Sequence, residues 1–149
     1  MVNKTLFKFA LAALAVMAVI PVAGEIAPGY EGKNYPVTAP VKVETIKIYD
    51  SRDGWIYFSM STPKLRECSW RNTVFYVGRR SAGLNAIAPF EHLEGPQVRG
   101  IGDLFWEKNR TRLSEFDLLN FSYADVYHQC QGWWRFWQTR TPFYDAPEG

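Results

Sequence analysis

The chain has 149 residues, of which 16% are aromatic, and it carries 17 basic and 15 acidic side chains. Two of the basic residues, Lys4 and Lys8, precede an apolar N-terminal run, and without them acids and bases are equal in number. A neutral domain lacks the basic footprint of a nucleic-acid-binding protein, so we expect no nucleic-acid partner. The segment after residue 24 is long enough for one domain with its own core.

The N-terminal segment has the order of a secretory signal peptide. The two lysines are followed by an apolar run, FALAALAVMAVI over residues 9–20, and then by Pro21 and small residues. The run is shorter than the roughly 20 residues that a spanning helix needs. We therefore expect a signal peptide over residues 1–24, cleaved after Gly24, and an exported protein in the periplasm or the medium. The alternative is a retained segment, which would then be the protein's contact with the membrane.

Residues 25–40 are expected to form an extended lead-in. They contain three prolines and two glycines and lack apolar periodicity, which disfavours a helix. Residues 41–145 are then expected to form one β-rich domain, and residues 146–149 a polar tail.

The domain begins with the alternating segment VKVETIKIY over residues 41–49, which predicts a first strand. Asp53-Gly54 is a strong hairpin signal and predicts a return strand over residues 55–60. The further elements are expected, in chain order, as a helical turn over residues 61–65, strands over 67–77 and 84–90, an irregular stretch over 91–102, a polar turn over 107–112, a strand or short helix over 113–121, and strands over 123–129 and 133–143.

Short strands separated by turn signals predict an all-β fold, a small antiparallel sandwich or barrel with one disulfide. The alternative is an α+β fold in which residues 113–121 form one short helix.

Cys68 and Cys130 are the two cysteines of the chain. In an exported protein both meet an oxidising compartment, so we expect one intramolecular disulfide. Closing a loop of this length stabilises the folded state by about 4 kcal/mol in the chain-entropy account, and native-state strain reduces that value. A redox-active pair would need the short Cys-x-x-Cys spacing, which is absent.

The histidines and acids form no recognisable catalytic or metal-binding pattern. His128 lies two residues before Cys130, so in a strand the two side chains share a face, and His128 is expected to be a buried structural histidine. His92 lies between Glu91 and Glu94 in a predicted loop, where these groups alone are too few for a metal site. We therefore favour a protein that is not an enzyme and expect no metal and no cofactor.

The most unusual segment is WWRFWQTR over residues 133–140. In a strand, Trp133, Arg135 and Trp137 point to the same side. If that side faces solvent, the three form a flat binding strip, since Trp and Arg are enriched at binding hot spots. If it faces the interior, the tryptophans are core residues.

The signal segment is followed by Arg66-Glu67-Cys68 at the start of a predicted strand and by VYHQC over residues 126–130 near the C-terminus. With these features the chain resembles small exported proteins of unknown function encoded by temperate bacteriophages. The resemblance implies a role in the cell envelope, such as blocking a second infection or binding a host envelope component, and it implies no catalytic residues.

The export signal, the disulfide and the lack of catalytic groupings together predict a non-enzymatic binding or structural module that acts in the cell envelope or outside the cell. Its partner would be an envelope component or another protein. One alternative is a hydrolase of envelope polysaccharide that uses carboxylates remote in sequence. The other is an inhibitor or superinfection-exclusion protein.

Overall fold

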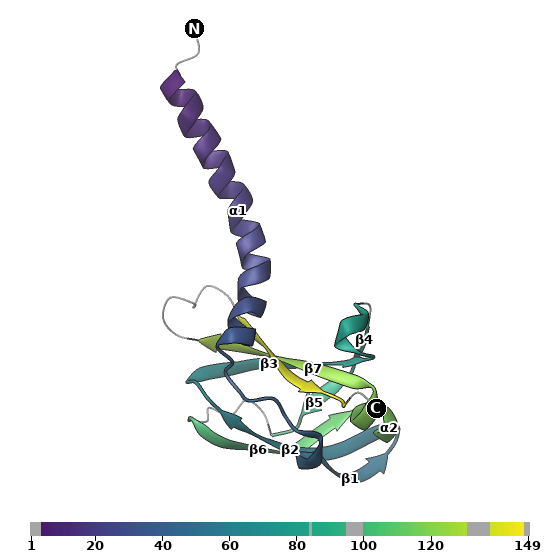
Figure 1. Cartoon of the computed structure of the whole chain (residues 1–149). Helices are drawn as coiled ribbons and strands as arrows, with labels where there is room; N and C mark the ends of the chain where they lie inside the picture. The colour runs from purple at the N-terminus through teal and green to yellow at the C-terminus, as the bar shows by residue number, and fades with distance from the viewer. Residues whose placement is uncertain (1–3, 84, 95–99, 131–137, 148–149) are drawn as a thin grey trace.

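Two antiparallel sheets and one long N-terminal helix make up the computed structural model, which describes residues 4–83, 85–94, 100–130 and 138–147 (Figure 1). The elements are α1 (Lys4–Asn34), η1 (Val43–Thr45), β1 (Lys47–Arg52), β2 (Trp55–Lys64), β3 (Cys68–Val77), η2 (Arg80–Ala82), β4 (Ala86–Ala88), β5 (Phe90–His92), β6 (Gly102–Thr111), α2 (Glu115–Asn120), β7 (Ser122–Cys130) and β8 (Thr139–Asp145).

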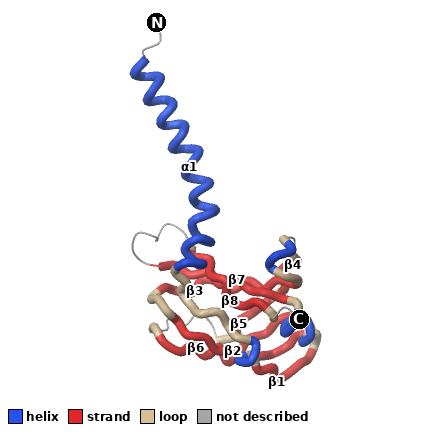
Figure 2. The backbone as a smooth tube through the Cα atoms, viewed as in Figure 1, coloured by secondary structure: helices blue, strands red, loops and turns tan. Residues whose placement is uncertain are grey.

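The first sheet has the strand order β1-β2-β6-β5, and the second has the order β4-β3-β7-β8. The named strand pairs are antiparallel, and the two sheets pack on one another as layers of a sandwich (Figure 2). Cys68 on β3 and Cys130 on β7 are register partners and are joined by a disulfide across 62 residues of chain. The predicted antiparallel sandwich with one disulfide is therefore confirmed.

The hairpin between β1 and β2 turns at the predicted dipeptide. Asp53 and Gly54 have φ values of 53° and 72°, as a two-residue type I′ turn requires, and Arg52 and Trp55 form the pair next to it. The return strand is confirmed and runs four residues further than predicted, to Lys64.

The predicted strand over residues 41–49 is wrong in its first half. Residues 43–45 form the 3₁₀ turn η1, and β1 begins only at Lys47. The Thr45 hydroxyl donates to the Lys42 carbonyl at 2.8 Å, and such a local bond competes with strand pairing.

The predicted helical turn over residues 61–65 and polar turn over 107–112 are also wrong, because β2 and β6 pair along their length from Ile56–Thr111 to Lys64–Gly102. The polar residues that suggested a turn lie instead on the solvent side of a long strand or, like Asn109, make buried hydrogen bonds.

The predicted strand over residues 84–90 is split at Pro89, which ends β4 in the second sheet and precedes β5 in the first. Proline has no N–H for a strand ladder. The predicted irregular stretch over 91–102 likewise begins two residues too early, since β5 continues to His92.

The segment over residues 113–121 forms the helix α2. Ser114 caps it, because its Oγ accepts from the Asp117 amide at 3.0 Å and its hydroxyl donates to the Asp117 carboxylate at 2.7 Å. The predicted strand over 123–129 is β7. Of the last predicted strand, only the part after residue 137 lies within the described residues, as β8.

The extended lead-in over residues 25–40 is wrong for its first ten residues, because α1 continues to Asn34. The last turns of α1 pack directly on β8. At Gly32 a Cβ atom would lie 1.8 Å from the Arg140 carbonyl oxygen, so only glycine permits this approach. Tertiary contact thus outweighs the weak helix propensity of this segment.

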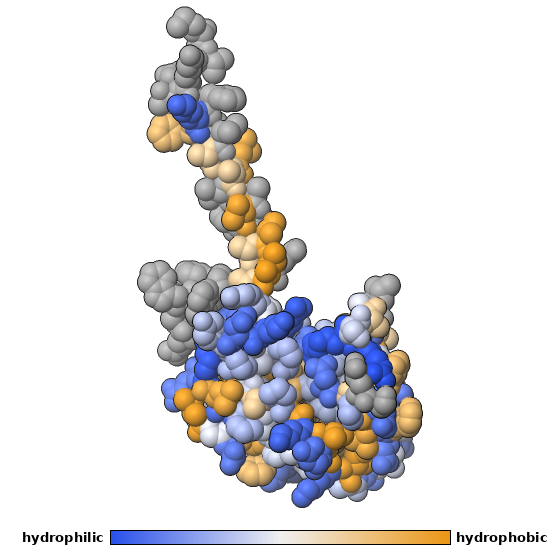
Figure 3. Space-filling model, viewed as in Figure 1, coloured by the Kyte–Doolittle hydropathy of each residue, from blue (hydrophilic) through white to orange (hydrophobic). Residues whose placement is uncertain are grey.

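The remainder of α1 leads away from the sandwich, and between residues 8 and 26 the side chains that the structure describes are exposed (Figures 1 and 3). Among the described residues, no helix combines the length and apolar character needed to cross a membrane.

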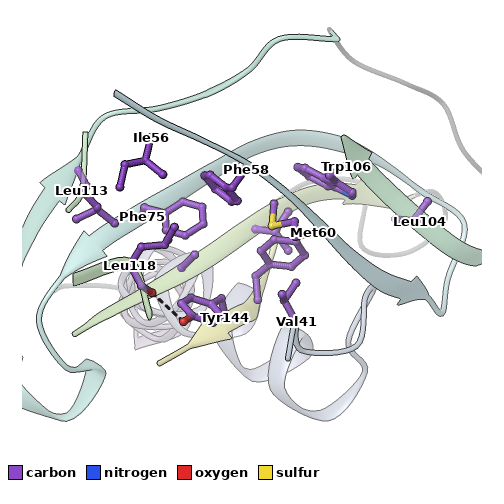
Figure 4. Close-up of a cluster of buried hydrophobic side chains, with 14 residues drawn as sticks. Val41, Ile56, Phe58, Met60, Phe75, Leu104, Trp106, Leu113, Leu118 and Tyr144 are labelled. Atoms are coloured by element: carbon purple, nitrogen blue, oxygen red, sulfur yellow. Dashed lines mark hydrogen bonds between the residues drawn. The ribbon is translucent and has the colours of Figure 1, made fainter. Parts of the chain in front are cut away.

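The core is apolar toward one end of the sandwich (Figure 4). Phe58, Phe75 and Phe90 form a ring cluster with centroids 4.9–6.3 Å apart, and the Tyr144 hydroxyl donates to the Leu118 carbonyl at 2.8 Å. The buried residues of this apolar cluster are Val41, Ile56, Phe58, Met60, Phe75, Ala88, Leu104, Trp106, Leu113, Leu118, Ala124, Val126, Phe143 and Tyr144.

Toward the disulfide the interior becomes polar. Lys64 is 7% exposed, and burial lowers its pKa. From α1, the buried Glu31 carboxylate accepts from Arg66 at 2.9 Å and from the Thr139 hydroxyl at 2.7 Å. This polar end also holds His128, which shares the inward side of β7 with Cys130.

Candidate functional site

The predicted binding strip of Trp133, Arg135 and Trp137 lies outside the described residues. Whether these three side chains bind a partner or pack in the core is therefore not tested by the structure, and the binding strip stays a prediction.

The predicted burial of His128 is confirmed, because the side chain is 2% exposed. Burial lowers its pKa to about 4, and the positive charges of Lys64 and Arg66 act in the same direction. The imidazole is therefore neutral at pH 7. Among the described residues, its Nδ1 is a buried nitrogen without a hydrogen-bond partner.

His92 lies on β5 at the edge of the core. Its Nδ1 is 2.9 Å from the Asn109 Oδ1, and its ring packs against Trp70 and Trp106 with centroids 6.0 and 5.1 Å away. The neighbouring Glu91 turns to the opposite side of the strand and pairs with Arg110. Within the described ranges, no three histidine, cysteine or acidic side chains are grouped for a metal ion.

The solvent side of the first sheet carries a cluster that we call the arginine–aromatic face. It follows from strand alternation, because Ile56 and Phe58 point into the core and leave Trp55 and Tyr57 on the outer side. The face consists of Arg52 on β1, Trp55 and Tyr57 on β2, Arg110 on β6, and Arg112 just beyond β6.

Tyr57 lies near the middle of this face. The neighbouring guanidinium groups of Arg110 and Arg52 lower its pKa. The Arg52 guanidinium also lies over the Tyr57 ring, 4.8 Å from its centroid, and Tyr49 packs beside it at 6.5 Å.

Two arginine side chains lie over the ring of Trp55. The Arg110 and Arg112 guanidinium carbons lie 4.4 and 4.8 Å from the centre of its ring system. Both distances are within the range of cation–π contacts. Stacking on a half-buried ring holds these long side chains in place, so each guanidinium is oriented before any partner arrives.

Two carboxylates already occupy part of the arginine–aromatic face. Glu91 accepts from the Arg110 Nε at 2.8 Å and from its Nη2 at 2.5 Å, a two-point contact. Asp50 lies 3.3 Å from the Arg52 Nε. Among the ion pairs of the described residues, none includes Arg112. The face therefore holds three cations against two paired anions.

The chain matches no known protein family, and neither the curated proteins nor the solved structures contain a match to it. A function can therefore be inferred only from the geometry of the candidate site.

Sequence reasoning missed the arginine–aromatic face. Residues 107–112 were expected to form a turn, in which Arg110 and Arg112 have no fixed direction. The signal that indicates the face is the period-2 spacing of these arginines, which matches the spacing of Trp55 and Tyr57 on the neighbouring strand.

Proposed function

We propose that this protein is an exported, non-enzymatic binding module whose arginine–aromatic face holds an anionic group of a partner in the cell envelope or outside the cell. The observation that carries the proposal is the convergence of Arg52, Arg110 and the Tyr57 phenol at one exposed place, with Arg112 beside them.

Guanidinium groups suit this task because their planar edge donates two parallel hydrogen bonds to a carboxylate or phosphate. Within the chain itself, Arg110 shows how such an edge engages a carboxylate, because its Nε and Nη2 both donate to the Glu91 Oε2. Arg112 has no such carboxylate partner among the described ion pairs and is exposed. We infer that an incoming anion first contacts Arg112 and then competes with Asp50 and Glu91 for the neighbouring donors.

The architecture is compatible with export and with cleavage after Gly24. Described side chains of α1 upstream of Ala27 are exposed, so their removal breaks few contacts. Cleavage at that point retains Glu31 and its bonds to Arg66 and Thr139, which attach the helix to the sandwich. A disulfide is likewise expected in a protein that reaches an oxidising compartment. Export, the signal peptide and the origin in a temperate phage stay predictions.

Co-sedimentation of the exported protein with envelope fractions tests the binding proposal. The variant Arg112→Gln should weaken binding about tenfold, the effect of losing one hydrogen bond to a charged group. Tyr57→Phe should weaken it by a smaller factor. The matched control is Arg71→Gln, which removes the same charge from an exposed position on β3 in the other sheet.

Equal binding by Arg112→Gln and Arg71→Gln would contradict the proposal. Protease treatment of the envelope fraction distinguishes the source of the anion, since binding lost after digestion indicates a protein partner and binding that persists indicates a polymer or lipid. Release of soluble sugar in the same assay would instead support a polysaccharide hydrolase.

A further inference from the structure

A second candidate site lies at one end of the second sheet, away from the arginine–aromatic face. It is an open pocket of about 380 Å³ formed where β3 runs into η2, where α2 passes into β7, and where β8 ends. Its volume is within the range of about 300–1,000 Å³ that small-molecule sites occupy. In Figure 1 the end of β8 lies beside α2, and the Ala146 amide donates to the Ser122 carbonyl at 2.9 Å.

Arg80 fixes the walls of this pocket. Its Nε donates to Asp145 at 2.9 Å, its Nη1 donates to the buried Asp125, and its Nη2 donates to the Ala124 carbonyl at 3.1 Å. The guanidinium also lies 4.4 Å from the centre of the Tyr123 ring. Because three strands or turns are tied together by one side chain, the pocket is formed before a ligand arrives.

The charges around the pocket balance, which argues against an ionic ligand. Arg79 and Arg80 line it, Asp145 lines it as well, and Asp125 lies behind Arg80. Two arginines and two carboxylates thus surround the pocket, and their formal charges cancel. Arg80 already directs donors from its three nitrogens to groups of the protein, so an anion would have to displace Asp125 or Asp145.

The remaining polar groups favour a ligand that donates hydrogen bonds. The Asn120 amide nitrogen donates to the Phe116 carbonyl at 3.0 Å, which leaves its Oδ1 to accept. The Asp145 side chain is 52% exposed and keeps accepting capacity beyond its bonds to Arg80. The Ser81 hydroxyl lines the same pocket. Hydroxyl groups of a ligand match this set.

An apolar surface completes the pocket. Phe121 is 42% exposed and lines the pocket together with Ala146. An exposed aromatic residue and several acceptors that line the same pocket suit a molecule with a C–H face on one side and hydroxyls around its edge.

We propose that this pocket binds a neutral sugar unit, whose C–H face packs on Phe121 and whose hydroxyls donate to Asn120 and Asp145. The site is distinct in place and in ligand charge from the arginine–aromatic face, so either proposal can fail without the other. The ligand class follows from the balanced charges, the exposed acceptors and the aromatic surface.

Titration of the ¹⁵N-labelled full chain with maltose, cellobiose and N,N′-diacetylchitobiose, followed by NMR, tests the proposal. At least one of these neutral sugars should shift the Asn120 side-chain amide and the backbone amides of Ser81 and Ala146 in a saturable manner. Phe121→Ala should weaken that binding at least about tenfold, and Phe121→Leu, which keeps an apolar side chain, should weaken it by a smaller factor. Phe116→Ala is the control, since Phe116 is 70% exposed on α2 and does not line the pocket.

Three outcomes would overturn the proposal. One is the lack of saturable shifts at these amides with any of the three sugars at millimolar concentration. Another is sugar binding that Phe121→Ala and Phe116→Ala reduce equally. The third is a set of shifts at these amides with inorganic phosphate and not with the sugars, which would identify an anion site instead.

Discussion

The apolar and polar ends of the sandwich interior differ in what holds them together. At the apolar end, packed rings such as Phe58 and Phe75 are 0% exposed and need no partner beyond each other. At the polar end, Lys64 and His128 occupy interior positions, where a charged or polar group is costly unless it is neutral or partnered. The disulfide and the end of α1 both lie beside this second group of residues.

This difference shows how a small sandwich tolerates polar residues inside. The disulfide ties β3 to β7 next to His128, and Glu31 from α1 satisfies Arg66 and Thr139. Packing energy therefore dominates at one end, while covalent and electrostatic contributions dominate at the other. Four measurements of unfolding free energy test this division.

The largest effect is expected at the apolar end. Phe75→Ala should lower the unfolding free energy by about 3–5 kcal/mol, because it leaves a cavity against Phe58, Phe90 and Tyr144. Urea denaturation measures the change. The control Phe116→Ala, at an exposed position on α2, should stay within about 0.5 kcal/mol of the parent. Similar losses of unfolding free energy in both variants would mean that packing of the buried rings does not stabilise the apolar end.

Loss of the disulfide is expected to have the next largest effect. Replacing Cys68 and Cys130 together by serine should lower the unfolding free energy by about 2–4 kcal/mol, since the unfolded chain gains the freedom of a 62-residue loop. Thiol labelling of the parent protein should be negative until a reductant is added. An unchanged urea midpoint in the double variant would show that the polar end is equally stable without the covalent bond.

The pH dependence of stability should report on the buried imidazole. The pKa of His128 falls from 6.5 in the unfolded chain to about 4 in the folded one, so at pH 5 the unfolded state binds the proton and the folded state does not. Stability attributable to this group is complete above pH 6.5 and is lost as the pH falls toward 4. Between pH 7 and pH 5 the loss should be about 2 kcal/mol.

Urea midpoints of the parent and of His128→Leu at pH 7 and pH 5 measure this contribution. The variant should lose most of the pH dependence, whereas His92→Leu, at the half-buried histidine on β5, should retain it. An equally steep loss in the parent and in His128→Leu would assign the pH dependence to other groups.

The smallest effect is expected where α1 meets the polar end. Glu31→Gln should lower the unfolding free energy by about 1–2 kcal/mol, because it weakens the hydrogen bonds from Arg66 and Thr139. Urea denaturation again measures the change. Glu44→Gln, which removes an exposed carboxylate from η1, is the matched control and should have little effect. A result in which the two variants behave alike would mean that Glu31 does not attach the helix.

The strands of the apolar end could be predicted from alternation and turn residues, but the register of β3 could not. Simple alternation from Cys68 and Trp70 would place Val74 inside. The register shift between Trp70 and Asn72 instead places Thr73 and Phe75 inside. A bulge of one residue reverses every later side chain, so simple alternation along the strand predicts the wrong residues inside.

The candidate sites could be predicted even less, because each combines residues from several elements. The arginine–aromatic face joins Arg52 to Arg110 through strand pairing across β2, and the Arg80 contacts join the η2 turn to β7 and β8. Neither grouping leaves a spacing pattern that spans the chain. The burial of His128 was predictable because its alternation with Cys130 is local.

The close approach at Gly32 has a consequence for association between molecules. β8 is an edge strand, and edge strands present unpaired N–H and C=O groups that can pair with another chain. Here the last turns of α1 pack along β8, and the Val41 amide donates to the Phe143 carbonyl at 2.7 Å. A variant such as Gly32→Ala, which pushes the helix off this strand, would expose the edge and should make the protein prone to aggregate through intermolecular strand pairing.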